Sequence, residues 1–326
     1  MSKKVVVSGI KPTGRFHFGN YFGAMRQYIE YGNSGDYETY IFLANYHALT
    51  SISDGEILRQ MTHEAVAAHI ACGLDLSKVT FFKQSDVQEV TELTWIFNTL
   101  VSMPFMMRAH AFKDSEAKDK EVNVGVFDYP VLMASDILIY GADIVPVGQD
   151  QKQHVEYTRD IAGYFNRAYR TELFKLPKEY IVPEVATLPG IDGQKMSKSY
   201  NNHIELFCSD EDLQKRVMGI VTDSATPEDK KNPDENSIYN IHKHFLTKEE
   251  DLTLRTKFEQ GGYGYKQAKE DLLATIRNWR EGKKEIYDDL MGHPEKIEAL
   301  LREGGEKARA RAQETMKQVR VQVGLE

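Results

Sequence analysis

The feature that most constrains the fold is an alternation of short, β-rich apolar runs with helical stretches over the first two hundred residues. Four runs are predicted to be strands, namely Lys4–Val7, Tyr40–Ala44, Val79–Lys83 and Asp143–Val147. Gly73 is placed to end the helix before the third run as a C-cap. Because strands separated by helices need crossover connections, the pattern predicts a mainly parallel sheet in a Rossmann-like α/β domain.

The pattern changes near residue 205, after which strand-like runs disappear. Four later stretches are predicted to be helices, namely Ser209–Val217, Lys248–Phe258, Tyr265–Glu281 and Pro294–Val321. The polar stretch Thr226–Asn236 is predicted to be a loop. A chain of 326 residues is long enough for two domains. We therefore expect a Rossmann-like catalytic domain over residues 1–205 and an all-helical C-terminal domain over residues 206–326.

Composition excludes several classes of protein. No apolar run approaches the roughly 18–20 residues that span a bilayer, and the N-terminal apolar run is too short for a signal peptide. The two cysteines, Cys72 and Cys208, are far apart, which argues against a disulfide framework or a cysteine-rich metal site. The net charge of −8 argues against non-specific coating of nucleic acid but allows a local basic patch. We expect a cytoplasmic protein with no membrane partner and no protein-built metal site.

The first chemical motif is Lys195-Met196-Ser197-Lys198-Ser199, which follows Gly190 and Gly193. Two lysines three residues apart on a glycine-flanked segment suit a mobile loop that closes over phosphates. Their ammonium groups would stabilise negative charge on a departing pyrophosphate. The alternative is a solvated basic turn.

The second motif is Pro12-Thr13-Gly14-Arg15-Phe16-His17-Phe18-Gly19-Asn20, directly after the first predicted strand. A Rossmann-like domain presents a strand-to-helix turn and a helix N-terminus to anions at this point. His17 and Asn20 lie three apart, so both can donate to phosphate oxygens from one helical face. Gly19 has no side chain and would let an adenine ring approach the backbone. The alternative is a structural glycine-rich turn.

A third motif lies in the stretch YPVLMASDILIY, where Pro130 suits the first turn of a helix. Tyr129, Met133 and Asp136 fall at i, i+4 and i+7, which places them on one helical face. An aromatic ring, a thioether and an accepting carboxylate suit a large flat ligand with one N–H, such as indole. The alternative is a core helix with a paired aspartate.

Together the H-x-G-N and K-M-S-K-S motifs resemble the signature pair of class I aminoacyl-tRNA synthetases. The stretch YPVLMASDILIY, followed by VGQDQKQH, is similar to the bacterial tryptophanyl branch of that family. The resemblance continues through Thr222-Asp223-Ser224 and the terminal EGGEKARARA, and so covers nearly the whole chain. Lys11 replaces a glutamine common in these relatives, and Asn201-Asn202 differ from their Asp-Pro-Asn. These departures indicate a sub-branch.

The resemblance implies roles for individual residues. The catalytic set would be His17, Asn20, Lys195 and Lys198. The ATP-binding set would be Lys11, Pro12, Thr13, Gly19, Asn20, Lys113, Gly148, Gln149, Asp150, Lys195, Met196, Ser197, Lys198 and Ser199. The tryptophan-binding set would be Val7, Gly9, His47, Tyr129, Met133, Asp136, Val147 and Gln151. In these sets Asp136 would read the indole N–H, Gln151 would place the α-amino group and Asp150 would hold the ribose hydroxyls. For Lys113 a solvated charged loop is an equal alternative.

The resemblance also implies a tryptophan–tRNA ligase activity. ATP would be a substrate that forms tryptophanyl-adenylate, with Mg²⁺ carried by the ATP phosphates. The partners would be L-tryptophan, ATP, the tRNA for tryptophan and a second copy in a homodimer. The helical domain would read the anticodon. Lys307, Arg309 and Arg311 supply positive charge near the start of the last helix, and an ordinary solvated helix is the alternative for them.

Two rival interpretations stay open at this point. A tyrosyl-tRNA synthetase would share both motifs, and Asp136 could accept a hydrogen bond from a phenol as well as from an indole. Met133 argues against it, because tyrosyl enzymes usually carry glutamine there. An inactive, synthetase-like RNA-binding or regulatory protein is the second rival. Such a protein is expected to have lost a motif lysine or the His17/Asn20 pair, and this chain keeps them all.

Overall fold

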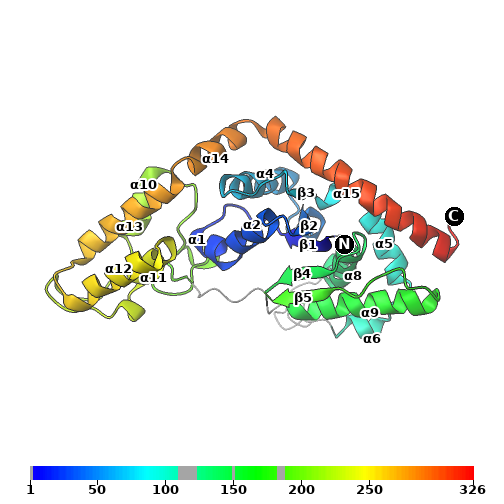
Figure 1. The fold of residues 1–326 in the computed structure, drawn as a ribbon, viewed down its shortest axis with the longest axis horizontal. Helices are drawn as coiled ribbons and strands as arrows, with labels where there is room; N and C mark the ends of the chain where they lie inside the picture. The colour runs from blue at the N-terminus through cyan, green and yellow to red at the C-terminus, as the bar shows by residue number, and fades with distance from the viewer. Residues whose placement is uncertain (1–2, 109–122, 149–150, 182–187) are drawn as a thin grey trace.

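The computed structural model describes residues 3–108, 123–148, 151–181 and 188–326. Its centre is a five-stranded parallel sheet in the order β3-β2-β1-β4-β5 (Figure 1). The strands are β1 (Lys4–Ile10), β2 (Tyr37–Leu43), β3 (Val79–Lys83), β4 (Ile144–Val147) and β5 (Lys178–Ile181). The four predicted strands and the Rossmann-like fold are confirmed. β5 was not predicted because its sequence, KEYI, has two charged residues in four and no apolar run.

The order of the strands reverses beside β1. β1 pairs with β2 on one side and with β4 on the other, while β3 and β5 lie at the two edges. Ligands of open α/β sheets bind at such a reversal, outside the carboxyl ends of the strands. The segments that leave Ile10 of β1 and Val147 of β4 are therefore placed at the expected ligand crevice.

Helices cover both faces of the sheet and produce two apolar cores. One core includes residues of α2 (Arg26–Asn33) and α4 (Gly55–Ala71), and the other includes residues of α5 (Glu89–Asn98), α8 (Val124–Leu138) and α9 (Lys152–Ala168). Shorter elements complete this region, namely α1 (Phe18–Asn20), η1 (Tyr21–Met25), α3 (Asn45–Ala48), η2 (Gln84–Asp86) and α6 (Met103–Met106). Gly73 follows α4 with φ of 100°, which confirms the predicted helix end, because glycine adopts this left-handed region without steric cost.

Only helices and turns follow residue 205 in the structure. The predicted helices correspond to α10 (Asp210–Met218), α12 (Lys248–Gln260), α13 (Tyr265–Arg280) and α15 (Pro294–Val323). Further elements, which were not predicted, lie before and between them, namely η4 (Lys198–Tyr200), η5 (Pro233–Glu235), α11 (Ser237–His242), η6 (Lys243–Phe245) and α14 (Lys283–Gly292). In the predicted loop, the buried Lys231 ammonium donates to the carbonyl oxygens of Thr226 and Asp229 at 2.8 and 2.9 Å, which explains how a polar segment is ordered.

The last helix, α15, returns from the helical region and runs along edge strand β3 (Figure 1). The approach is close at Gly304, where a Cβ atom would lie 1.9 Å from the carbonyl oxygen of Phe81. Ile297 of α15 belongs to the first apolar core, and Met316 belongs to the second. The helix thus covers an otherwise open sheet edge and joins the helical region to the sheet. No helix within the described ranges is both long and apolar enough to cross a lipid bilayer.

Candidate active site

A cavity of about 640 Å³ opens at the carboxyl ends of β1 and β4. Its walls come from β1, from the segment after β2, and from α8, β4 and the residues that follow β4. Of the residues predicted to bind the amino acid, all but Asp136 line this cavity. The residues that line it are Val7, Gly9, His47, Tyr129, Met133, Val147 and Gln151. Residues from four elements, β1, α3, α8 and β4, and Gln151 from the segment before α9 therefore meet at this cavity.

The face of α8 that looks toward the cavity carries Tyr129, Met133 and Asp136. Tyr129 and Met133 line the cavity, whereas Asp136 is 1% exposed and lies behind the wall, in contact with His47. Pro130 was predicted to lie in the first turn of this helix, but it does not. The helix begins at Val124, where the Asn123 side chain caps the N-terminus by accepting from the Val126 N–H, and Pro130 lies inside it. The spacing of the three residues is unaffected because they share the same helix.

The Asp136 carboxylate is held by two donors. Gln84 Nε2 donates to both carboxylate oxygens at 2.9 and 2.8 Å, and His47 Nε2 lies 2.9 Å from Oδ2. Burial raises the pKa of Asp136, and the hydrogen bonds from His47 and Gln84 act in the opposite direction. A buried carboxylate with these donors is fixed in orientation and is suited to accept from a ligand N–H.

The signature segment after β1 forms a helix N-terminus. His17 is the N-cap of α1, its Nδ1 accepts from the Asn20 backbone N–H at 3.3 Å, and its own backbone N–H donates to Asn20 Oδ1 at 3.2 Å. An amide N–H can only donate, so Nδ1 is the acceptor and the neutral ring carries its proton on Nε2. The His17 ring and the Asn20 amide NH₂ are thus both available as donors, which fits the predicted role toward phosphate oxygens.

The protonation of His17 is set by its surroundings. Burial, together with the neighbouring His203 and Lys198, lowers the pKa of His17 to about 4. The rings of His17 and His203 lie 5.6 Å apart between centroids. His17 is therefore a neutral imidazole at neutral pH, a hydrogen-bond donor without formal charge.

The two signature segments touch each other. Met196 is 4% exposed, and its sulfur accepts from the Gly19 backbone N–H at 3.3 Å. Lys198 Nζ donates to the Thr13 carbonyl oxygen at 2.7 Å. A Cβ atom at Gly19 would lie 2.9 Å from His17 Nδ1 and 3.3 Å from Met196, so the glycine permits this close packing. The predicted catalytic residues therefore lie on two contacting segments at one end of the sheet.

One residue that organises the lysine-bearing turn was not assigned a role from the sequence. Asn202 is 2% exposed, and its Oδ1 accepts from the Ser197 N–H at 2.8 Å. Its Nδ2 donates to Asp192 Oδ1 at 2.7 Å and to the Lys195 carbonyl oxygen at 3.0 Å. Asparagine is common in turns, so the sequence alone gives no signal that this one bridges three parts of the loop.

Gly19 and Asn20 lie in α1, and the other predicted ATP-binding residues divide into four groups. Lys11 and Gly148 line the cavity itself, and Pro12 and Thr13 precede the α1 turn. Lys195, Met196, Ser197, Lys198 and Ser199 form the turn described above. Lys113, Gln149 and Asp150 lie outside the described residues.

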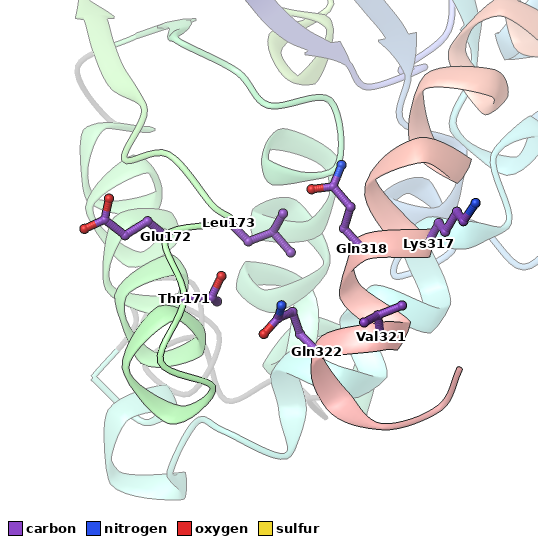
Figure 2. A pocket seen from close by; sticks show the side chains of 7 residues that line it. All are labelled: Thr171, Glu172, Leu173, Lys317, Gln318, Val321 and Gln322. Atoms are coloured by element: carbon purple, nitrogen blue, oxygen red, sulfur yellow. The ribbon is translucent and has the colours of Figure 1, made fainter.

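Another surface hollow has a volume of about 450 Å³ (Figure 2). It lies between the segment that precedes β5 and the last turns of α15. It is lined by Thr171, Glu172, Leu173, Lys317, Gln318, Val321 and Gln322. None of the predicted site residues is among them, so the cavity at β1 and β4 is the candidate active site.

The three basic residues Lys307, Arg309 and Arg311 lie in the middle of α15 and are engaged within the chain. Arg309 Nε pairs with the buried Glu89 at 2.9 Å, and Lys307 Nζ pairs with Glu303 at 2.8 Å. Arg311 contacts Glu314 and the Tyr140 carbonyl oxygen, each at 3.4 Å. For Arg309 in particular, these contacts favour a role in attaching α15 to α5 over a role in binding RNA.

Comparisons with known proteins identify the family of this chain. The model of the family "tRNA synthetases class I (W and Y)" matches residues 2–279. The chain is 46% identical over 319 residues to a tryptophan–tRNA ligase of Fusobacterium nucleatum, covering 98% of this chain and 97% of that one. The crystal structure of a tryptophanyl-tRNA synthetase from Campylobacter jejuni with ADP and tryptophan superposes with a TM-score of 0.92 at 42% identity, covering 98% of this chain and 99% of that one.

Proposed function

The chain belongs to the class I tRNA synthetases of the tryptophan and tyrosine group, and we infer from this membership that it is a tryptophan–tRNA ligase. The reaction has two steps. The tryptophan carboxylate attacks the α-phosphorus of ATP, and pyrophosphate leaves while tryptophanyl-adenylate stays bound. A terminal ribose hydroxyl of the tRNA then attacks the activated carbonyl carbon and releases AMP.

One observation carries the choice of amino acid. Met133 lines the cavity and the buried Asp136 lies directly behind its wall, both on the same face of α8. In our proposal the indole ring lies against Met133 and its N–H donates to Asp136. Tyr129, His47, Val7, Gly9 and Val147 enclose the ring, and Gln151 binds the α-amino group. The thioether of Met133 adapts to a flat bicyclic ring and is only a weak hydrogen-bond acceptor for a phenol O–H.

The ATP phosphates are assigned to the two contacting signature segments. His17 Nε2–H and the Asn20 NH₂ donate to phosphate oxygens, while Lys195 and Lys198 neutralise charge on the departing pyrophosphate. This assignment is supported by the neutral, Nε2-protonated state of His17 and by the contact of Lys198 with Thr13. Positioning and charge stabilisation account for the rate, and no side chain forms a covalent intermediate.

Mg²⁺ enters the proposal as an ion carried by ATP. The side chains at the signature segments are lysine, histidine and asparagine, which offer positive charge and donors to phosphate oxygens. Such a set fits the ATP–Mg²⁺ complex, with the ion bound mainly by phosphate oxygens. When bound, the ion would neutralise further charge on the β- and γ-phosphates.

The remaining parts of the proposal concern the partners. Residues 1–205 form the catalytic domain, and residues 206–326 form the helical domain that reads the tRNA anticodon. A homodimer is supported by exposed apolar side chains on α5, α6 and α8, where Trp95, Met103 and Val124 are 72%, 63% and 80% exposed. Cytoplasmic localisation follows from the substrates, since ATP, tRNA and free tryptophan are available there.

The test is amino-acid-dependent ATP–pyrophosphate exchange, run with tryptophan and tyrosine side by side. We expect exchange with tryptophan and none above background with tyrosine. Exchange with tyrosine in place of tryptophan would keep the chemistry but overturn the pocket assignment. Absence of exchange with both amino acids would overturn the proposed activity.

A further inference from the structure

Gln84 is a buried residue at the carboxyl end of β3, in the short helix η2, and its side chain is 2% exposed. Its carbonyl oxygen Oε1 accepts from the backbone N–H of Tyr46 at 3.0 Å and lies 3.4 Å from the N–H of His47. Because a backbone N–H can only donate, the oxygen of the amide must face α3. The NH₂ end of Gln84 is consequently forced to face the opposite way.

The NH₂ end meets Asp136. Gln84 Nε2 lies 2.9 Å from Oδ1 and 2.8 Å from Oδ2, and His47 Nε2 lies 2.9 Å from the same Oδ2. A carboxylate offers about four lone-pair sites. Three are occupied by these contacts, which leaves one on Oδ1 for a further donor.

We propose that Gln84 is a positioning residue that determines specificity for a ring N–H, because it holds Asp136 as an oriented hydrogen-bond acceptor behind the amino-acid cavity. This inference rests on the proposed function, in which Asp136 reads the indole N–H. Gln84 is not among the residues that line the cavity, so it acts through Asp136.

The physical reason is the cost of burying a carboxylate. A buried carboxylate needs donors to remain ionised, and burial raises the pKa of Asp136 while Gln84 and His47 oppose that rise. Without the Gln84 donor, Asp136 either takes up a proton or turns toward another partner. In both cases it is a poorer acceptor for a ligand N–H, and the enzyme loses its preference for ligands that have one.

The experiment compares tryptophan with β-(3-benzothienyl)alanine, in which sulfur replaces the indole N–H. The measured quantity is the ratio of the two kcat/KM values in ATP–pyrophosphate exchange. In Gln84→Met, which has similar length but no donor, we expect this ratio to fall about tenfold or more. Gln84→Glu is a second variant. It keeps the shape of the side chain but replaces the NH₂ donor with an oxygen and places a second negative charge beside Asp136. We expect the same fall in the ratio of the two kcat/KM values.

The matched control is Asn45→Leu. Asn45 also joins α3 to η2, through hydrogen bonds of 2.7 and 3.1 Å with Ser85, but makes no hydrogen bond with Asp136. We expect Asn45→Leu to lower both kcat/KM values by the same factor and to leave their ratio unchanged. If the Gln84 variants also lower both values equally, Gln84 is merely structural and the inference is overturned.

Asp136→Ala separates this inference from the proposed function. If Asp136→Ala lowers the ratio and the Gln84 variants do not, Asp136 reads the N–H and only the role of Gln84 is wrong. If Asp136→Ala leaves the ratio unchanged, the assigned role of Asp136 fails, and the inference fails with it.

Discussion

Lys198 Nζ donates a 2.7 Å hydrogen bond to the carbonyl oxygen of Thr13, across 185 residues of sequence. This bond joins the lysine-bearing turn to the segment that also carries His17 and Asn20. Because the two segments touch, the turn that carries the motif lysines and the donors of α1 lie at one end of the sheet, where one triphosphate can contact both. The preorganised arrangement leads to the first prediction.

Replacing Lys198 with methionine should lower kcat for ATP–pyrophosphate exchange about 10²- to 10³-fold, because one charge that stabilises the departing pyrophosphate is lost. The melting temperature should change little, since the side chain is only partly buried. Lys215→Met, at an exposed lysine of α10, is the matched control and should retain full exchange. Equal activity in the two variants would contradict the role of Lys198.

Asn202→Asp should raise the KM for ATP and lower kcat, because a second carboxylate would then face Asp192 in place of the NH₂ that now donates to it. Steady-state exchange kinetics at varied ATP measure both constants. The double variant Asp192→Asn/Asn202→Asp restores an amide–carboxylate pair and should recover part of the loss. No recovery would show that the Asp192 contact is not what positions the turn.

Acid should destabilise the protein through His17. Its pKa is about 4 in the folded protein because of burial and of His203 and Lys198, against an ordinary value near 6.5 in the unfolded chain. Between these values the unfolded state binds more protons, so stability is fully present above pH 6.5 and is lost as the pH falls toward 4. Urea unfolding at several pH values should show a shallower loss in His17→Gln. A slope identical to that of the parent protein would contradict the assigned pKa.

Gly304→Ala should destabilise the fold by about 1–3 kcal/mol or more, because the added methyl would overlap the Phe81 carbonyl oxygen. Thermal unfolding provides the measurement. Gly292→Ala is the control, since a Cβ atom there meets nothing within 4 Å and alanine favours the helix by about 0.5–1 kcal/mol. If both variants are equally stable, α15 does not pack against β3 as closely as described.

Trp95→Glu should shift the proposed dimer toward monomer, because Trp95 is 72% exposed on α5 and a charge would have to be buried at the interface. Light scattering after size-exclusion chromatography measures the mass. Leu252→Glu, at a 66% exposed leucine of α12, is the control and should leave the mass unchanged. A parent protein that is monomeric at micromolar concentration would contradict the dimer.

The parallel sheet and the helices α10, α12, α13 and α15 were predictable because their apolar periodicity is local. The short elements β5 and α11 were not, since few residues carry each pattern and tertiary packing decides their structure. The ten-residue helix α14 was not predicted either. The start of α8 was misplaced because Pro130 favours a first turn, whereas Asn123 supplies the cap that starts the helix.

The candidate site follows a similar division. His17, Met133 and the two motif lysines could be identified because short motifs and helical spacing place them. Gln84 acts through a buried hydrogen bond with Asp136, which is distant in the sequence. Asn202 acts through hydrogen bonds that bridge its own turn. An isolated glutamine or asparagine has no sequence signature of such a role. The course of α15 back along β3 depends on long-range packing that periodicity alone does not encode.

The central claim is that Asp136 accepts a hydrogen bond from the indole N–H of bound tryptophan. Proton–nitrogen NMR of tryptophan labelled with ¹⁵N in the indole ring, bound to the parent protein and to Asp136→Ala, tests it directly. The account predicts a bound indole proton shifted downfield and protected from exchange in the parent protein, with both effects lost in the variant. An indole proton that resembles free tryptophan in the parent protein, or one unchanged by the substitution, would contradict the account.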